Sequence, residues 1–584
     1  MEACDVHRLA AALLLLASVV SGEPVSCQVR ARIDSGWVCG LRRWADNNTA
    51  YASFRGVPYA KQPLGELRFK ELQPAEPWDY LDASEEGPIC PQHDVFYDKM
   101  MTSHKMDEAC IYANIHVPLE ALPETGQRRP SRDLKPPHET GLNDEEEQLP
   151  GLPILVFVHG GGFAFGSGDS DVYGPEYLVS KGVIVITFNY RLNAIGFLSL
   201  NTSSIPGNNG LRDILTLLRW VRTNARAFGG DPERVTLGGQ SAGASAAHLI
   251  SFAPEAQGLF KRLILMSGTA LPTFFTLSPV YAQHVANMFL SHLDINSTDP
   301  EEAHRQLIEV PIEKIMHANR LIIDYFGATT FFPVLETKLP GVTPIVTEEP
   351  EILISEGHGR DIPLLIGFTT AECESFRPRF EQIDLMTRIK ENPLIMVSPE
   401  VIFNTPQSDL LDIAKSIEQR YFDGVPIMKE FVKSCSDNFY IYPAFKLAEK
   451  RQEKGGAPVF LYQFSYEGEN NVIKEAKGIN YKGVAHLEDM TYVFKMNSIL
   501  GTQVSFPPSN SDDLMQERMT SIVRNFVSCS HPTCIGNDVS AWMPVDPYLR
   551  YQDIENPAYF RSTDPTLEQR DMIEFFDSIY NSTT

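Results

Sequence analysis

The chain has 584 residues, of which 43% are hydrophobic and 21% are charged. This composition is typical of a globular protein and excludes disordered and collagen-like chains. The 75 acidic residues outnumber the 50 lysines and arginines, so the formal net charge is −25. Proteins that bind nucleic acid or anionic lipid rely on a basic surface, and neither is an expected partner here. The length alone suggests about four domains of roughly 150 residues each.

An apolar run near the N-terminus predicts a secretory signal. Residues 9–20 read LAAALLLLASVV, which is too short to span a membrane. Small residues follow at Ser21 and Gly22, so we expect residues 1–22 to be a signal peptide and the mature protein to be secreted and extracellular. The alternative interpretation is a buried N-terminal helix.

Sequons and cysteines agree with an oxidising, extracellular compartment. Four Asn-X-Ser/Thr sequons begin at Asn47, Asn201, Asn296 and Asn581. Removing Cys4 with the signal leaves an even number of cysteines, which are Cys27, Cys39, Cys90, Cys110, Cys373, Cys435, Cys529 and Cys534. The sequence has neither a zinc-binding motif nor a lipid-anchor signal, so no metal, cofactor or stable membrane anchor is expected.

Short apolar runs alternate with helical segments along the chain, which predicts an α/β fold with parallel strands. The runs expected to form strands are 154–158, 183–188, 235–237, 263–266, 364–366 and 459–464. Residues 211–226 carry apolar side chains at the three- and four-residue steps of an amphipathic helix. A stretch rich in Pro, Glu and Arg at about 121–150 is expected to be a surface insertion rather than a binding tail.

The sharpest motif is GQSAG at residues 239–243. It follows the predicted strand at 235–237 and precedes a helical segment, which is the context of a nucleophile elbow. Glycines fit both ends of the motif because side chains there would collide with backbone, while Ser241 is expected to project into solvent. Ser241 is therefore the candidate nucleophile.

A serine nucleophile needs a base, and the oxyanion that it creates needs fixed hydrogen-bond donors. Residues 159–163 read HGGGF at the end of a predicted strand. We expect the oxyanion donors to be the amides of Gly161, Gly162 and Ala242. Phosphate binding by this glycine-rich run is disfavoured, because no Lys-Ser/Thr follows it as in a P-loop.

The acid and the base are expected downstream of the serine, in the order Ser, acid, His. Glu372 follows the predicted strand at 364–366, and His486 lies in the loop GVAHLED after another strand. Glu374 is the alternative acid. Because residues from 159 to 486 must meet in one site, we expect residues 23–584 to form one large domain rather than four.

These motifs resemble those of type-B carboxylesterases, the cholinesterase-like family of α/β-hydrolases, and most closely insect secreted carboxylesterases such as antennal and juvenile hormone esterases. The matching segments are FRGVPYAKQPLGELRF at 54–69, DEACIYANIHVP at 107–118, FNYRLNAIGFL at 188–198, GVAHLED at 483–489 and WMP at 542–544. The resemblance implies the α/β-hydrolase fold, with a large, mostly parallel central sheet, helices on both faces and an N-terminal β-hairpin.

The resemblance also implies a serine esterase with Ser241 as nucleophile, Glu372 as acid and His486 as base. Gln240 stands where many relatives have Glu, a form associated with the juvenile hormone esterase branch. The family's first disulfide corresponds to Cys90 and Cys110. Proximity along the chain suggests the other pairs, which are Cys27 with Cys39, Cys373 with Cys435 and Cys529 with Cys534.

Two features indicate the substrate class. Choline sites of the family use a Trp in the first disulfide loop, and residues 90–110 contain none. Residues 327–330 read GATT where acetyl-selective relatives have bulky aromatics, which implies a roomier acyl pocket. We therefore expect hydrophobic, uncharged esters, such as a hormone, an odorant or pheromone, or a xenobiotic. Four phenylalanines are candidates for pocket lining or for plain core aromatics, namely Phe163, Phe165, Phe274 and Phe275.

Two other functions are left open. One is a non-catalytic, neuroligin-like adhesion protein, although such relatives lose triad residues and carry a membrane span. The other is a scavenger that forms an acyl-enzyme and turns over slowly. We expect a monomer, with a dimer as the alternative.

Overall fold

The computed structural model describes residues 27–94, 96, 105–123, 151–271, 276–327, 329–398, 401–402, 405–422, 427–469, 471–477, 481–499, 502–503, 509–534, 542–559 and 561–581. The predicted signal at 1–22, most of the insertion at 121–150, Phe274 and Phe275 lie outside these residues.

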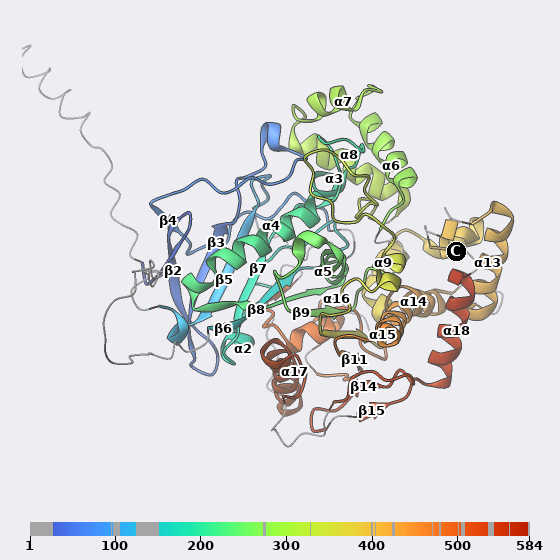
Figure 1. Cartoon of the computed structure of the whole chain (residues 1–584). Coiled ribbons are helices and arrows are strands. Elements are labelled where there is room, and N and C mark those ends of the chain that lie inside the picture. Colours follow the sequence, from blue (N-terminus) through green and yellow to red (C-terminus); the bar gives the residue numbers. More distant parts are fainter. Residues whose placement is uncertain are drawn as a thin grey trace, which may run out of the picture.

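A sheet of 13 strands forms the centre of the molecule (Figure 1). The strand order is β1-β2-β3-β5-β7-β6-β8-β9-β10-β11-β14-β15, and β4 pairs with β2. The strands are β1 Val29–Ile33, β2 Gly36–Trp44, β3 Ala50–Pro58, β4 Tyr80–Asp82, β5 Tyr112–Pro118, β6 Leu152–Val158, β7 Ile184–Phe188, β8 Gly230–Gln240, β9 Arg262–Met266, β10 Leu364–Thr369, β11 Val459–Phe464, β14 Tyr551–Ile554 and β15 Arg561–Thr563. A separate two-stranded sheet joins β12 Ser498–Ile499 to β13 Thr502–Gln503.

The six strands predicted from sequence correspond to β6 through β11. Pairing is parallel from β7 across the centre of the sheet to β14. Pairing toward both edges is antiparallel except between β2 and β4, which are parallel, and β1 and β2 form the predicted N-terminal hairpin. The predicted fold is confirmed, with the refinement that the complete sheet is mixed.

Helices surround this sheet (Figure 1). They are α2 Glu176–Val179, α3 Asn193–Phe197, α4 Asn209–Asn224, α5 Ala242–Phe252, α6 Pro279–His292, α7 Pro300–Leu307, α8 Ile312–Phe326, α9 Pro350–Glu356, α10 Arg377–Gln382, α11 Leu385–Glu391, α13 Gln407–Tyr421, α14 Met428–Ser436, α15 Tyr442–Lys454, α16 Val472–Lys477, α17 Asn510–Cys529 and α18 Leu567–Asn581. Within the described residues, none of these helices has the length and apolar character needed to cross a bilayer.

Strand β6 shows why both faces of the sheet are covered. Ile154 and Val156 belong to the same hydrophobic core as Leu211 of α4. Leu155 and Phe157 point the other way and belong to a second core with the apolar residues of α17. Successive strand side chains point to opposite faces, so an uninterrupted apolar strand requires a covering layer on each side.

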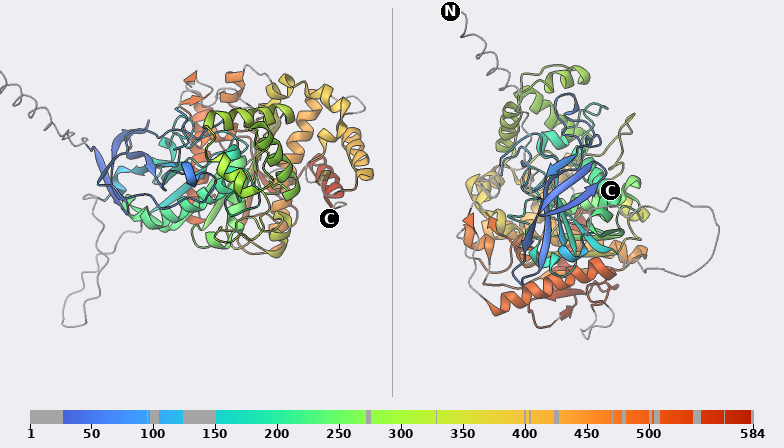
Figure 2. Two further views of the ribbon diagram at one scale, coloured as in Figure 1. Left: turned by 90° about the horizontal axis from the view of Figure 1, so that it is seen from above. Right: turned by 90° about the vertical axis from the view of Figure 1, so that its left-hand side faces the viewer.

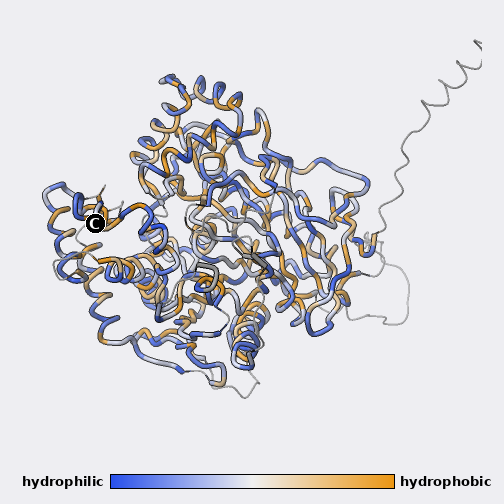
Figure 3. The backbone as a smooth tube through the Cα atoms, turned by 180° about the vertical axis from the view of Figure 1, so that it is seen from behind, coloured by the Kyte–Doolittle hydropathy of each residue, from blue (hydrophilic) through white to orange (hydrophobic). Residues whose placement is uncertain are grey.

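The outer helices lie in two groups. Helices α6, α7 and α8 are inserted between β9 and β10, and they lie together at the top of Figure 1. Helices α13, α14 and α18 lie at the end of the molecule opposite the N-terminal strands (Figure 2). Hydrophobic and hydrophilic positions alternate along the outer helices (Figure 3), as expected when each helix turns one apolar face to the core.

Four disulfides link segments of the described chain. They join Cys27 to Cys39, Cys90 to Cys110, Cys373 to Cys435 and Cys529 to Cys534, with Cα–Cα distances of 5.0, 4.9, 6.0 and 6.1 Å. These are the pairs expected from the sequence. The bridge from Cys373 to Cys435 ties the segment after β10 to α14, and both of its cysteines are buried.

Candidate catalytic site

Ser241 occupies a tight turn between β8 and α5. Its φ and ψ are 58° and −129°, a combination that non-glycine residues rarely adopt and that marks local backbone strain. Its backbone N–H donates to the carbonyl oxygen of Met266 at 2.8 Å, and its own carbonyl accepts from the N–H of Ser245 at 3.0 Å. These two bonds hold the turn between a neighbouring strand and the following helix.

The glycines of the motif are required by close backbone approaches. A Cβ on Gly239 would lie 2.4 Å from the carbonyl carbon of Gly243, and a Cβ on Gly243 would lie 2.2 Å from the carbonyl oxygen of Val158. Neither contact is sterically possible, so the turn can form only with glycine at both positions.

Ser241 is only 7% exposed, so the expectation that it projects into open solvent is wrong. Neighbouring loops pack over the elbow. A Cβ on Gly160 would lie 3.0 Å from the Cβ of Ser241, and a Cβ on Gly268 would lie 2.3 Å from its carbonyl oxygen. The serine therefore lies below the surface, at a point where three strand ends converge.

The expected oxyanion donors are available for binding. The N–H groups of Gly161, Gly162 and Ala242 donate no hydrogen bond to any described residue. Gly161 and Gly162 have φ values of 109° and 59°, so this turn after β6 uses left-handed conformations that favour glycine. The amide of Ala242 is one of the free N–H groups at the start of α5.

Glu372 and His486 form a direct pair. Oε2 of Glu372 lies 2.6 Å from Nδ1 of His486, and Oε1 accepts a hydrogen bond from the backbone N–H of Thr369 at 2.7 Å. Both side chains are buried, with exposures of 0% and 2%. The N–H of His486 donates to the carbonyl of Glu372, and the hydroxyl of Ser375 donates to the carbonyl of His486. Side chains and backbone thus hold the imidazole in place together.

Glu374, the alternative acid, lies elsewhere. Its carboxylate is 3.7 Å from the guanidinium of Arg377, and burial raises its pKa above the ordinary value although Arg377 partly opposes the rise. Glu372 and Glu374 belong to one short helix, η6 Glu372–Phe376. Because their side chains leave this helix in different directions, only Glu372 meets the imidazole.

The second ring nitrogen of His486 contacts Gln240. The two Nε2 atoms are 2.9 Å apart, and Gln240 is fully buried at the end of β8, directly before Ser241. From the sequence, Gln240 was noted only because many relatives have Glu at this position, and no contact was predicted for it. Its contact with the imidazole follows from the fold, which brings β8 and the His486 loop together.

Aromatic side chains enclose the imidazole. The rings of Tyr440 and Phe376 lie 4.9 and 5.3 Å from it, centroid to centroid. Phe376 in turn packs against Phe96, which lies in the first disulfide loop. None of these three residues was predicted from the sequence to belong to the site. Phe96 could have been found from its position between Cys90 and Cys110. Phe376 and Tyr440 could not, because only the tertiary fold brings their segments close to His486.

Phe163 and Phe165 are both fully buried and pack against other aromatics. Phe163 contacts Phe197 and Phe332, and Phe165 contacts Phe96. Phe163 therefore belongs to the core, while Phe165 packs against Phe96, which contacts the Phe376 ring beside His486. The candidates Phe274 and Phe275 lie outside the described residues.

Asp489 is a further buried carboxyl close to the pair. It is 0% exposed, and the hydroxyl of Tyr462 donates to its Oδ2 at 3.2 Å. Burial raises the pKa of Asp489 to about 7, and the negative charge of Glu372 adds to the rise. This group therefore changes charge near neutral pH without touching the imidazole.

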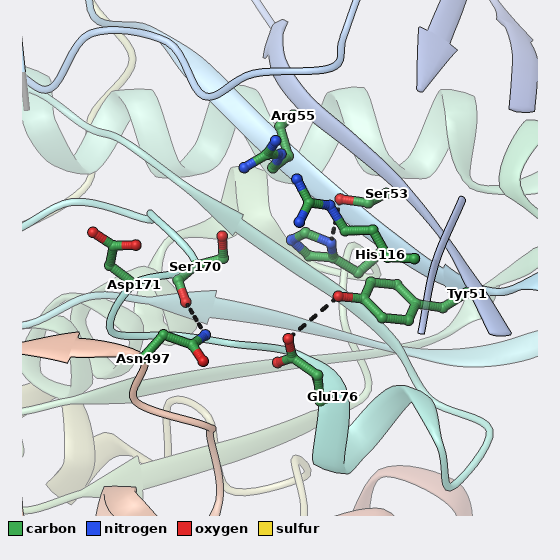
Figure 4. Close-up of a pocket in the computed structure, with 9 residues that line it drawn as sticks. Tyr51, Ser53, Arg55, His116, Ser170, Asp171, Glu176 and Asn497 are labelled. Carbon is green, nitrogen blue, oxygen red and sulfur yellow. Dashed lines mark hydrogen bonds between the residues drawn. The ribbon is translucent and has the colours of Figure 1, made fainter. Parts of the chain in front are cut away.

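A separate polar cavity of about 280 Å³ lies beside β3 and β5 (Figure 4). It contains a second Ser–His pair, in which Oγ of Ser53 is 3.1 Å from Nδ1 of His116. Burial, together with the positive charges of Arg55 and Arg43, lowers the pKa of His116 to about 3. Within the described residues, Nε2 of His116 has no partner, so no carboxylate supports this ring as Glu372 supports His486. Among the described residues, this pair therefore lacks the carboxylate of a catalytic triad.

Three of the four predicted sequons can be located on the surface. Asn47, Asn201 and Asn296 are exposed. The side chain of Asn581 lies outside the described residues.

Comparison with known proteins gives consistent matches. The family model "Carboxylesterase family" matches residues 27–571. The chain is 53% identical to juvenile hormone esterase of Heliothis virescens over 98% of both chains. It is 29% identical to esterase FE4 of Myzus persicae, over 92% of this chain and 90% of that one. A crystal structure of juvenile hormone esterase from Manduca sexta, with OTFP covalently attached, superposes with a TM-score of 0.87 at 53% identity, covering 95% of this chain and 99% of that one.

Proposed function

Because the chain belongs to the carboxylesterase family and is a carboxylic ester hydrolase, we propose that it works through Ser241 as nucleophile, His486 as base and Glu372 as acid. The observation that carries this proposal is the buried contact of 2.6 Å between Glu372 and His486, beside the strained turn that holds Ser241. A serine esterase needs this arrangement of nucleophile, base and orienting carboxylate.

The reaction has two halves. Oγ of Ser241 attacks the ester carbonyl carbon while Nε2 of His486 accepts its proton, and the proton then leaves with the alcohol as the ester C–O bond breaks. In the second half His486 accepts a proton from water, the hydroxide attacks the acyl carbon, and the acid departs as Ser241 regains its proton. Glu372 keeps Nδ1 protonated and stabilises the imidazolium.

The oxyanion of each tetrahedral intermediate would be bound by the amides of Gly161, Gly162 and Ala242. These donors are free within the described chain, and they belong to two rigid turns that meet at Ser241. Preorganised donors of this kind stabilise developing charge more than mobile water does.

For the substrate we propose a hydrophobic, uncharged ester, with juvenile hormone as the first candidate. Relatives at 53% identity bear the name juvenile hormone esterase. The aromatic rings beside His486 and the small side chain of Thr329 beside Gly162 fit an apolar acyl or alcohol group. Xenobiotic and odorant esters are the alternatives, because they share this chemistry.

Several further expectations belong to the same proposal. Residues 1–22 would direct secretion and be removed, and residues 23–584 would form one catalytic domain. The four disulfides and the exposed sequons at Asn47, Asn201 and Asn296 suit an extracellular protein.

The test compares the wild type with Ser241→Ala on a generic aryl ester. We expect turnover to be abolished, while Ser251→Ala, at the far end of the same helix, retains it. An organophosphate should leave an adduct on Ser241 that mass spectrometry locates. Retention of most activity in Ser241→Ala would contradict the assignment, and a burst without steady turnover would indicate a scavenger. Rates on juvenile hormone and on esters of graded chain length then decide the substrate.

A further inference from the structure

The side-chain amide of Gln240 contacts His486 through its nitrogen, while its oxygen is buried without a partner among the described residues. Nε2 of Gln240 faces Nε2 of His486 at 2.9 Å, whereas Oε1 of Gln240 is buried and has no partner among the described residues. The amide has room only because residue 160 is glycine, since a Cβ there would lie 2.7 Å from that oxygen. A buried carbonyl without a partner is costly and calls for an explanation.

The two charge states of the imidazole place different demands on this amide. The carboxylate of Glu372 can only accept, so Nδ1 carries a proton and Nε2 of the neutral ring is an acceptor. The NH₂ group of Gln240 then donates to Nε2. To accept the proton of Ser241, Nε2 must release the amide, and the Nε2–H that forms then donates to the departing alcohol.

We propose that Gln240 is a positioning residue that holds the neutral imidazole of His486 until the hydroxyl of Ser241 takes its place on Nε2, and that its lack of charge leaves the electrostatic support of the imidazolium to Glu372. The proposal rests on the proposed function of His486 as base. A glutamate of the same shape would act differently, because it would place a second carboxylate on the ring and favour the imidazolium.

The surroundings of the ring make the charge at position 240 decisive. Among the described residues, Glu372 is the only charged side chain in hydrogen-bond contact with the imidazole. The rings of Tyr440 and Phe376 pack against it and carry no charge.

The other titratable groups of the His486 loop have their own partners. Glu488 accepts from the N–H of Ala485 and from the hydroxyl of Tyr481, and Asp489 accepts from Tyr462. They act on the ring only from a distance.

The experiment measures kcat/KM of an uncharged aryl ester against pH for the wild type, Gln240→Glu and Gln240→Met. In Gln240→Glu the apparent pKa that governs the fall of kcat/KM at acid pH should rise by about one unit or more. At pH values below that pKa, kcat/KM should be roughly tenfold lower than in the wild type, and at high pH it should recover. Gln240→Met has a similar shape without polar atoms. This variant should have the same apparent pKa at acid pH as the wild type, with a kcat roughly tenfold lower and an unchanged KM.

Gln463→Glu is the matched control, because Gln463 lies on β11 and bonds to Ser465 and Gln569 rather than to His486. It should reproduce the wild-type profile. A Gln240→Glu profile that overlays the wild type would overturn the proposal, as would equal shifts in Gln240→Glu and Gln240→Met.

If Gln240→Glu does not fold, Gln240→Met decides, and a wild-type kcat in that variant would overturn the proposal. If the wild type does not hydrolyse esters, the proposed function fails and this inference fails with it. If the wild type is active and both Gln240→Glu and Gln240→Met have its kcat/KM profile, this inference alone is overturned.

Discussion

The carboxylate of Glu372 lies 2.6 Å from Nδ1 of His486, although 114 positions separate the two residues. The contact is completely buried, and backbone bonds on both sides keep the two residues in register. A carboxylate in this position fixes the tautomer of the base and stabilises its charged form. Its removal should therefore act on catalysis far more than on substrate binding.

Glu372→Gln should lower kcat by roughly 10²- to 10⁴-fold and leave KM nearly unchanged, because the amide keeps the shape of the carboxylate but not its charge. Glu374→Gln is the matched control in the same short helix and should retain activity. Steady-state kinetics on an aryl ester measures both. A similar loss in the two variants would show that the helix, rather than the Glu372 carboxylate, is what matters.

Gly161→Ala and Gly162→Ala should differ in severity. A Cβ at position 161 would lie 2.0 Å from the carbonyl oxygen of Phe165, so the loop must move and should displace the proposed oxyanion donor. Loss of one donor typically costs about 10²- to 10³-fold in kcat. At position 162 the nearest atoms are 3.5 Å from the added Cβ, and φ is 59°, so strain of about 1–2 kcal/mol is the main cost. Kinetics and thermal unfolding of both variants check the order, and a milder effect at position 161 would contradict it.

Asp489 should make stability depend on pH. Because its pKa in the folded chain is about 7 against an ordinary value of 3.8, the folded chain keeps a proton that the unfolded chain releases between these values. Its contribution to stability is fully present below about pH 4 and is lost as the pH rises through 7. Asp489→Asn removes this titration, so the variant should gain stability relative to the wild type as the pH rises.

Urea unfolding between pH 4.5 and 8 measures the difference between Asp489→Asn and the wild type. Asp361→Asn serves as the control, because the side chain of Asp361 is 84% exposed. A difference between Asp489→Asn and the wild type that stays constant with pH would refute the assignment.

Each disulfide should contribute to the free energy of unfolding according to the length of the loop that it closes. Cys373 and Cys435 are 62 positions apart, and Cys529 and Cys534 are 5 apart. Loop-closure entropy then predicts losses of about 4 and about 2 kcal/mol when each pair is replaced by alanine. Denaturant unfolding of the two double variants measures the loss, and equal losses would show that chain entropy is not the cause.

The elements that a short stretch of sequence determines were predictable. The strands from β6 to β11 follow from apolar runs, and the turn at Ser241 follows from glycines at positions 239 and 243. A contact within a few residues needs no knowledge of the remaining chain, because local sterics decide it. The same local argument explains why the turn at Ser241 could be predicted and the burial of Ser241 could not, since distant loops cover it.

Selection among distant residues is different. The chain has 14 histidines, and chain order and resemblance, rather than local chemistry, singled out His486. Glu372 was the predicted acid and Glu374 the alternative two residues away, and the different partners of their side chains in the structure separate them. The contact of Gln240 with the imidazole, and the aromatic rings around it, exist because the sheet brings β8, η6 and the His486 loop to one edge. Such contacts depend on the packing of the whole molecule, which the local sequence does not encode.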